Sequence, residues 1–163
     1  MGTIQVKGLD AVSLMLDRFE DDTEAIVKVG LYEGAGILAD AVKSEIEALP
    51  TDKGPITDSH PIMSGPTQVQ KDGLLSGFGI SRFRRDGDVI NVSIGFDGYN
   101  DFKTSHYPQG QPNVLVARSI NSGTSYMAKN PFVKRAINKA KDKAVEAVQE
   151  RIRKAAREIA ERK

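Results

Sequence analysis

Hydroxyl side chains and histidines are the residues of this sequence that could support nucleophilic catalysis. The string SGTSYMAKNPF contains Ser122, Thr124 and Ser125, and the candidate bases are His60 and His106. A serine nucleophile needs a base within hydrogen-bonding reach and a third group that orients this base. Both histidines lie in polar segments beside Pro or Tyr, and the G-x-S-x-G nucleophile elbow is absent. The sequence therefore predicts that the protein is not an enzyme, with a small hydrolase that uses Ser125 and a loop histidine as the alternative.

Metal and cofactor sites are not expected either. The chain has no Cys, which excludes disulfides and Cys-based zinc sites, and the two histidines are isolated. The acidic string DGDVINVSIGFDGYND lacks the ligand spacing of a calcium loop, and turns account for its Asp-Gly pairs. We therefore expect no catalytic, cofactor-binding or metal-binding residues.

Three glycines, Gly30, Gly34 and Gly36, interrupt a helical pattern early in the chain. A dinucleotide fingerprint would need a third suitably spaced glycine and a preceding strand, and the string EGAGILAD has neither. Each glycine costs about 1 kcal/mol relative to Ala in a helix interior. We therefore expect another element to pack closely against these small residues.

A cluster of basic side chains could contact a phosphate backbone. Arg82, Arg84 and Arg85 surround Phe83, and basic groups interleaved with an aromatic ring can track a nucleic acid. However, the isoelectric point near 7.9 is below that of a typical nucleic-acid-binding domain. A solvated hairpin edge protected by charge is the preferred interpretation. Phosphate contact by the three arginines stays as the alternative.

The charge of the chain is divided between its two ends. Residues 1–50 carry four basic and ten acidic side chains, whereas residues 131–163 carry eleven basic and five acidic ones, so the balances are −6 and +6. This division fits head-to-tail contact between copies, docking of the two ends within one fold, or two solvated faces. No stretch approaches about 18 apolar residues and the N-terminus shows no signal-peptide pattern, so neither a membrane span nor export is expected.

Hydrophobic periodicity predicts the elements that would position these residues. A short strand over residues 3–8 is followed by a helix that Asp10 can cap. A long helix then runs from about 24 to 49 and ends before Pro50. A second helical piece covers about 67–77.

The second half of the chain predicts a hairpin and a terminal helix. The strings GISRFRR and DVINVSIGF alternate in hydrophobicity and are joined by Asp86 and Gly87, which indicates a hairpin over 80–96 with a type I′ turn. The string VLVARSIN fits a helix or a strand. Pro131 suits the start of a helix over 131–162, about 45 Å long, whose far end is expected to project or to pack on a neighbour.

Two long irregular segments complete the expected fold. Segments 50–66 and 97–113 are rich in Gly, Pro and Asn and lack periodicity, and loops of this length in a compact domain are commonly mobile or functional. A chain of 163 residues is large enough for one core, so we expect a single domain over 1–163. The predicted fold class is α+β, a small antiparallel β-sheet packed by long N-terminal and C-terminal α-helices.

Four stretches of the sequence form a recognisable set. They are VKGLD with the long helix that ends in ALP, DGLLSGFGIS before the hairpin, SIGFDGYN at its close, and ARSINSGTSYMAKNPFVKRAINKAK. With these stretches, most of the chain resembles the tail-component family of long-tailed double-stranded-DNA phages, whose members act in tail completion or head–tail joining. The most specific motif is Gly123-Thr124 followed by Pro131-Phe132. The chain departs from the family at 121–122, Asn-Ser here, where many members carry an acidic residue and Phe.

The resemblance assigns SGTSYMAKNPF to a structural joint. Six residues form this candidate joint or subunit interface: Gly123, Thr124, Tyr126, Met127, Pro131 and Phe132. Gly123 permits a tight or left-handed turn, and the hydroxyl of Thr124 or Ser125 can bond nearby backbone. Pro131 is expected to start the terminal helix, and Phe132 to anchor it in the core. Tyr126 and Met127 are candidates for contact with a neighbouring subunit, or for packing within their own chain.

The resemblance implies a structural virion protein without a cofactor. Such a neck or tail-completion subunit would assemble as a ring, expected to be a hexamer, between the connector and the tail tube, with connector and tail-tube or terminator proteins as partners. It would be assembled in the bacterial host cytoplasm and reside in the virion. Segments 50–66 and 97–113 are expected to become ordered on assembly. The alternative is a nucleic-acid-binding assembly factor that uses the basic hairpin and the C-terminal helix.

Overall fold

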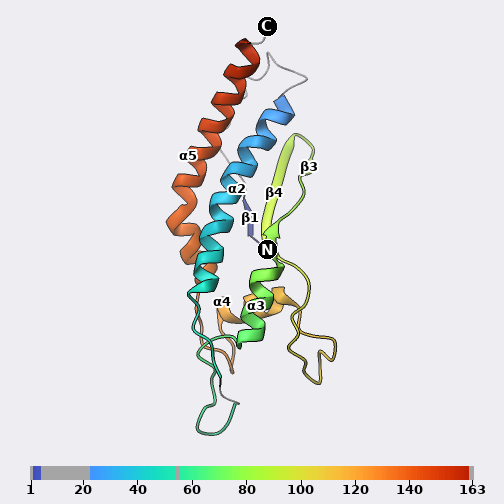
Figure 1. The fold of residues 1–163 in the computed structure, drawn as a ribbon, viewed down its shortest axis with the longest axis vertical. Helices are drawn as coiled ribbons and strands as arrows, with labels where there is room; N and C mark the ends of the chain where they lie inside the picture. Colours follow the sequence, from blue (N-terminus) through green and yellow to red (C-terminus); the bar gives the residue numbers. More distant parts are fainter. Residues whose placement is uncertain (1, 5–22, 54–55, 162–163) are drawn as a thin grey trace.

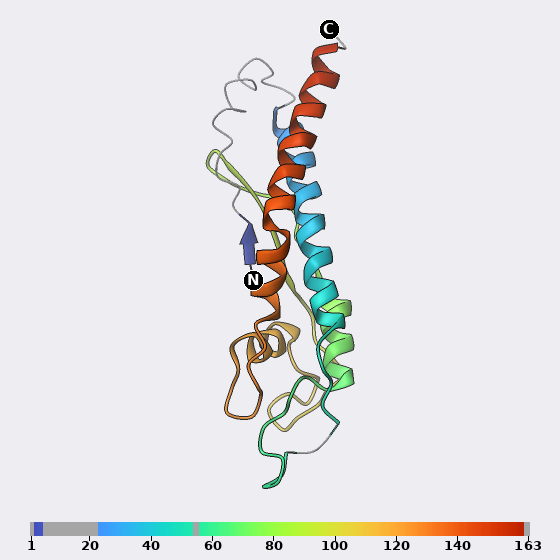
Figure 2. The same ribbon diagram turned by 90° about the vertical axis from the view of Figure 1, so that its left-hand side faces the viewer.

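Two long antiparallel helices run side by side along the protein (Figures 1 and 2). Helix α2 spans Thr23–Glu47 and helix α5 spans Phe132–Glu161. The N-terminus of α2 and the C-terminus of α5 lie at the same end of the molecule (Figure 1). The long helices predicted over 24–49 and 131–162 are therefore confirmed, and we refer to α2 and α5 together as the helix pair.

The computed structural model describes residues 2–4, 23–53 and 56–161. Part of the first predicted strand is present as β1, Gly2–Ile4. The remainder of that prediction, up to residue 8, and the helix expected from Asp10 lie outside the described residues.

Glycines let the two helices of the pair approach closely. A Cβ atom added at Gly30 would lie 2.6 Å from Cγ1 of Ile152. One added at Gly34 would clash with Cγ2 of Val148 and lie 3.1 Å from a backbone carbonyl oxygen of α5. The prediction of close packing is confirmed at these two positions. At Gly36 it is not met within the described part of the chain, where an added Cβ would lie within 4 Å of no atom.

A small antiparallel sheet packs against α2. Its central strand, β4 (Val89–Phe96), pairs with β1 along one edge. Along the other edge, β4 pairs with β2 (Phe78–Ile80) and then with β3 (Arg84–Asp86). The register shifts by one residue between these two short strands, so the three residues 81–83 oppose the two residues 92–93 and form a β-bulge.

The hairpin between β3 and β4 is confirmed, but its turn differs from the prediction. Asp86 pairs with Val89, so the turn residues are Gly87 and Asp88. A type I′ turn needs a positive φ at both central residues, whereas only glycines have a positive φ in the described part of the chain. Gly87, with a φ of 60°, is the first central residue, the position at which a type II′ turn takes Gly.

Two short helices close the core at the end opposite the C-terminus. Helix α3 (Gln68–Gly77) confirms the piece predicted over 67–77. It begins with a capping box, in which the N–H of Gln70 donates to Oγ1 of Thr67 at 3.3 Å and the N–H of Thr67 donates to Oε1 of Gln70 at 2.9 Å. Helix α4 (Asn113–Ser122) shows that the ambiguous string VLVARSIN is helical.

The hydrophobic core lies where the helix pair, the sheet, α3 and α4 meet. Its largest fully buried apolar side chains include Phe132, Ile46, Leu74 and Ile120. A smaller cluster continues between the two long helices: Ile26, Val148, Ile152 and Ala155. The far part of α5 therefore packs on α2 of its own chain, and the α+β fold class is confirmed. No helix within the described ranges is long and apolar enough to cross a membrane.

An ion cluster joins the end of α2 to the beginning of α5. Nε of Arg135 donates to Oε2 of Glu45 at 2.9 Å, and Nζ of Lys139 donates to Oε1. The Glu45 side chain is largely covered, with 11% exposed. The hydrogen bond from Lys139, followed by that from Arg135, holds the pKa of the Glu45 carboxyl below its usual value of 4.5, against the opposing effect of burial.

We expect alanine substitutions at two glycines of α2 to have opposite effects. Gly34→Ala forces Val148 or the α5 backbone to move and should lower the free energy of unfolding by about 1–3 kcal/mol. Gly36→Ala enters open space and gains helix propensity, so it should raise this free energy by up to about 1 kcal/mol. Urea unfolding at low protein concentration measures both values. Equal effects would contradict the close approach of the helices at Gly34.

Replacing Glu45 with Gln should destabilise the protein at neutral pH more than in acid. Because the pKa of Glu45 is lowered on folding, the ionised group contributes stability that is complete above about pH 4.5 and is lost as the pH falls through the folded-state pKa. We expect a loss of about 1 kcal/mol near pH 7, since both cations are partly solvated, and a smaller one near pH 3. Urea unfolding at both pH values, with Glu47→Gln as an exposed control, tests this. A loss that does not change with pH would argue against it.

Candidate docking surface at the loop end

Two segments that are far apart in the sequence pair at the end of the molecule opposite the C-terminus (Figure 2). The N–H of Met63 donates to the carbonyl oxygen of Tyr126 at 2.9 Å, and the N–H of Ala128 donates to that of Met63 at 2.8 Å. Met63 and Met127 thus form a parallel bridge. We call this end the loop end, and it comprises residues 50–53, 56–66, 97–112 and 123–131 together with α3 and α4.

This backbone pairing sends alternate side chains to opposite sides. Met63 and Met127 are 9% and 3% exposed and contribute to the core, whereas Ile62 and Tyr126 are 50% and 48% exposed. Of the two residues considered for a subunit interface, only Tyr126 therefore presents its side chain at the surface. The sequence analysis missed Ile62, because nothing near it in the sequence indicates its pairing with the segment around residue 127.

The joint between α4 and α5 has the local structure that its residues predicted. Gly123 has a φ of 76°, and an added Cβ would lie 2.9 Å from Cβ of Lys129. The N–H of Tyr126 donates to Oγ1 of Thr124 at 3.3 Å. The carbonyl oxygen of Pro131 accepts an early helical bond of α5. Phe132 is fully buried, so it anchors the start of α5 in the core.

A buried carboxylate holds the loop that contains Ile62. Asp52 accepts hydrogen bonds from the N–H of Ser64 at 2.8 Å and from Nε2 of His60 at 3.0 Å. The carboxylate lies between the serine and the histidine, whereas nucleophilic catalysis needs the histidine between serine and carboxylate. Within the described residues, neither histidine hydrogen-bonds to Ser125, because His60 contacts Asp52 and His106 contacts a neighbouring serine.

A network of amide side chains fixes both ends of segment 97–113. Asn113 is fully buried, and its Nδ2 donates to the carbonyl oxygen of Asp97 at 2.8 Å. Asn100 is also buried and donates from Nδ2 to Oδ1 of Asn113 at 3.4 Å. These bonds hold the ends of the segment against α3 and α4, and ordering of segment 97–113 on assembly stays a prediction. The tip and its neighbour Tyr99 stay accessible to a partner.

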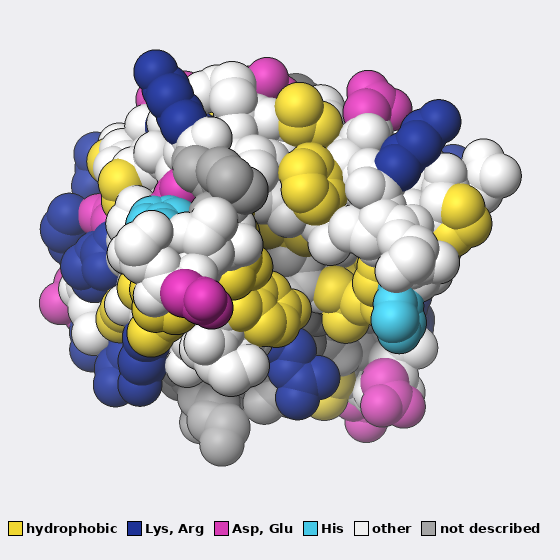
Figure 3. Space-filling view, turned by 90° about the horizontal axis from the view of Figure 1, so that it is seen from below, with side chains coloured by type: hydrophobic (Ala, Val, Ile, Leu, Met, Phe, Trp, Pro, Cys, Tyr) yellow, Lys and Arg dark blue, Asp and Glu magenta, His cyan; other side chains and the backbone are white. Residues whose placement is uncertain are grey.

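Exposed apolar side chains are concentrated at the loop end. Of the eleven large hydrophobic side chains that are exposed among the described residues, seven lie here, with exposed fractions between 40% and 69%: Ile56, Ile62, Val69, Tyr99, Val114, Leu115 and Tyr126. Figure 3 views the molecule from this end and shows hydrophobic side chains around a central hollow. Scattered apolar side chains are normal on a protein surface, but apolar groups gathered on one face indicate a binding site.

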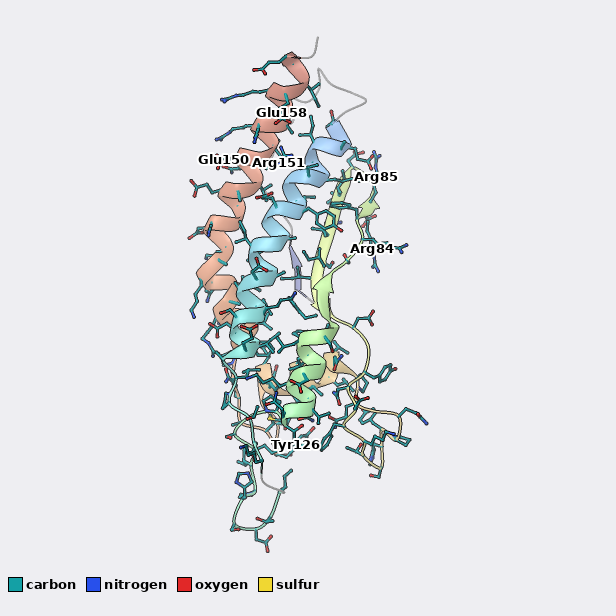
Figure 4. The ribbon with its side chains drawn as sticks, in the orientation of Figure 1. Arg84, Arg85, Tyr126, Glu150, Arg151 and Glu158 are labelled. Atoms are coloured by element: carbon teal, nitrogen blue, oxygen red, sulfur yellow. The ribbon has the colours of Figure 1, made fainter. Side chains whose placement is uncertain are left out.

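The three arginines of the hairpin lie elsewhere. Arg82, Arg84 and Arg85 are exposed, and Nη1 of Arg85 lies 3.2 Å from Oε2 of Glu24. The β-bulge places Phe83 against Tyr32 of α2, with 4.8 Å between the ring centroids, so its ring is not free to stack on a base. Figure 4 shows Arg84 and Arg85 on the hairpin, across α2 from α5 and far from Tyr126.

Neither metal-binding geometry nor similarity to known proteins adds a function to this surface. In the part of the chain that the structure describes, no group of three or more His, Cys, Asp or Glu side chains is placed to hold a metal ion. Comparisons with protein-family models, with curated proteins and with solved structures found no match to this chain.

Alanine substitutions at two adjacent residues of the loop end should change the free energy of unfolding by different amounts, because one side chain is buried in the core and the other is half-exposed. Met127→Ala removes a buried side chain and should lower the free energy of unfolding by about 2–4 kcal/mol. Tyr126→Ala removes a half-exposed ring and should change it by less than about 0.5 kcal/mol. Urea unfolding of the two variants measures the difference. A large loss for Tyr126→Ala would mean that its ring supports the fold rather than a docking surface.

Proposed function

We propose that the protein is a structural subunit of the neck or tail of a long-tailed phage, and that its loop end docks onto another protein of the particle. The observation that carries this proposal is the concentration of exposed apolar side chains at the loop end. Backbone pairing directs Ile62 and Tyr126 outwards, and the fixed ends of segment 97–113 hold Tyr99 beside α3 and α4. Burial of these side chains against a partner would supply the free energy of association.

The remaining parts of the proposal follow from the resemblance of the sequence to phage tail components. The subunit joins copies of itself in a ring, which we expect to be a hexamer, between the connector and the tail tube. Connector and tail-tube or terminator proteins are its partners, and it catalyses no reaction. It is assembled in the host cytoplasm and becomes part of the virion.

A nucleic-acid-binding assembly factor is the second candidate. Arg82 and Arg84 are exposed and form no ion pair within the described residues, which leaves both free to contact phosphate. Duplex DNA binding that weakens steeply with salt, and that is lost when both arginines are replaced by Gln, would favour this function. No binding at low salt would eliminate it.

Charged substitutions at the loop end should prevent co-assembly without unfolding the protein. The double variant Ile62→Asp, Tyr126→Asp places two carboxylates where the proposed contact excludes water, and we expect at least a tenfold loss of complexes with the connector and tail proteins of the same phage. Quantitative co-purification from cells that express all partners measures this loss.

A matched control for this experiment lies at the hairpin turn. Val89 is 52% exposed, and Val89→Asp changes a similarly accessible side chain far from the loop end. This variant should co-assemble like the wild type, and circular dichroism should show native helix content in both variants. Equal co-assembly of the loop-end variant and the control would contradict the proposed docking surface.

A further inference from the structure

A groove of about 620 Å³ runs along the face of α2 between the hairpin and α5. Its walls are formed by Phe83 on the hairpin side and by Arg151 of α5 on the other side, and Figure 4 shows these two elements flanking α2. Four α2 residues provide apolar or open surface inside it: Val29, Tyr32, Gly36 and Ile37. This groove is separate from the loop end.

Two features of the groove have no explanation among the described residues of one chain. Gly36 destabilises α2 relative to Ala, yet an added Cβ would meet no atom within 4 Å, unlike at Gly30 and Gly34. Val29 and Tyr32 are also exposed, although α5 and the sheet already cover other faces of α2. A helix that is apolar on several faces is normally buried. Both features fit a second helix that packs on α2 at Gly36.

The polar groups around the groove specify the chemistry of this second helix. Glu33 and Asp40 are exposed, and neither forms an ion pair among the described residues. Nη1 of Arg151 is buried and has no hydrogen-bond partner in the same part of the chain. A matching helix would therefore carry a basic side chain opposite the carboxylates and an acceptor opposite Arg151.

One flank of α5, which carries Lys141, Val145 and Gln149 and which we call the Val145 flank, has this chemistry. Helix α2 contains five acidic and two basic residues, whereas α5 contains nine basic and five acidic ones, so their charges are −3 and +4. Val145 is a large apolar side chain on α5 that is 40% exposed. It lies about 120° around the helix from Arg151, so it does not face the groove of its own chain.

Antiparallel packing of α2 from one copy on α5 from a second copy has a specific register. If Val145 of a second copy lies over Gly36, a step of four residues forward along α2 and back along α5 brings Lys141 beside Asp40. Ile152 contacts Gly30 within a chain, so Arg151 lies near the level of residue 31. The same register brings Gln149 of the second copy within one residue of this level, where its side-chain oxygen can accept from Arg151.

We propose that the groove of α2 binds the Val145 flank of α5 from a second copy of this chain. The contact joins two different surfaces, so one copy keeps a free α5 flank and the other keeps a free groove for further neighbours, as a ring or chain of subunits requires. This inference rests on the proposed function as an assembling structural subunit, and it assigns the surfaces that copies use with one another.

Cysteine cross-linking tests the contact directly, because the natural chain has no Cys. One preparation carries Gly36→Cys, and a second carries Val145→Cys with a mass tag. After mixing and mild oxidation, we expect at least five times more mixed disulfide dimer than in a control mixture of Gly36→Cys with Glu150→Cys. Glu150 is exposed and lies about 140° around α5 from Val145.

Three results would overturn the proposal. One is a yield of mixed dimer equal to that of the control. Another is a predominance of dimers between two Gly36→Cys chains, which would indicate a symmetric contact. The third is protection of Gly36→Cys from a maleimide at concentrations where the protein is monomeric, because residues of the same chain would then cover the groove.

A charge exchange provides a second measurement. Asp40→Lys and Lys141→Asp should each lower the average native mass at low salt, and mixing the two variants should restore part of it. No restoration would contradict the register. Both measurements use the purified protein alone, so they do not depend on the loop end. Cross-linking together with normal co-assembly of the loop-end variant would reject only the proposed function. Absence of cross-linking together with impaired co-assembly of that variant would reject only this contact.

Discussion

The close approach of α2 and α5 is the contact on which the rest of the structure depends. Gly30 and Gly34 remove the side chains that would hold the helices apart, so Ile152 and Val148 pack directly over the α2 backbone. The small residues of α5 extend this contact along its length: Ala136, Ala140, Ala144 and Ala155. With one face of α2 covered by α5, another is available to the sheet. The C-terminus of α2 and the N-terminus of α5 are thereby held at the same end, where the segments of the loop end lie (Figure 1).

This arrangement gives the two ends of the protein different surfaces. At the loop end, irregular segments are held by backbone pairing around Met63 and by buried polar groups such as Asp52 and Asn113, and apolar side chains point outwards. Along the helix pair, the exposed side chains are mostly charged. A buried polar side chain is stabilising only when its hydrogen bonds are made. The loops are therefore held by specific bonds rather than by a core of their own.

Sequence periodicity predicted the elements better than it predicted their contacts. The long helices, α3 and the hairpin each have a local signal, such as hydrophobic periodicity or the glycine of the turn. The turn type was wrong because its central residues are shifted by one from Asp86-Gly87. The pairing of Met63 with Met127 joins residues that are distant in sequence, so no local pattern reveals it. For the same reason, sequence alone could not distinguish Gly36 from the glycines that contact α5.

The charges of α2 and α5, which carry part of the opposed charge of the chain ends, are used on two faces of the helix pair. Within one chain, Glu45 of α2 meets Arg135 and Lys139 of α5, so part of the charge is neutralised inside the fold. In the groove of α2, Glu33 and Asp40 are exposed, and on the Val145 flank of α5, Lys141 is exposed. Docking of the ends within a fold and contact between copies are therefore compatible, because they use different faces of the same two helices. Solvent-exposed pairs contribute little stability each, so the charges would set register and partner choice while apolar contact at Gly36 supplies the affinity.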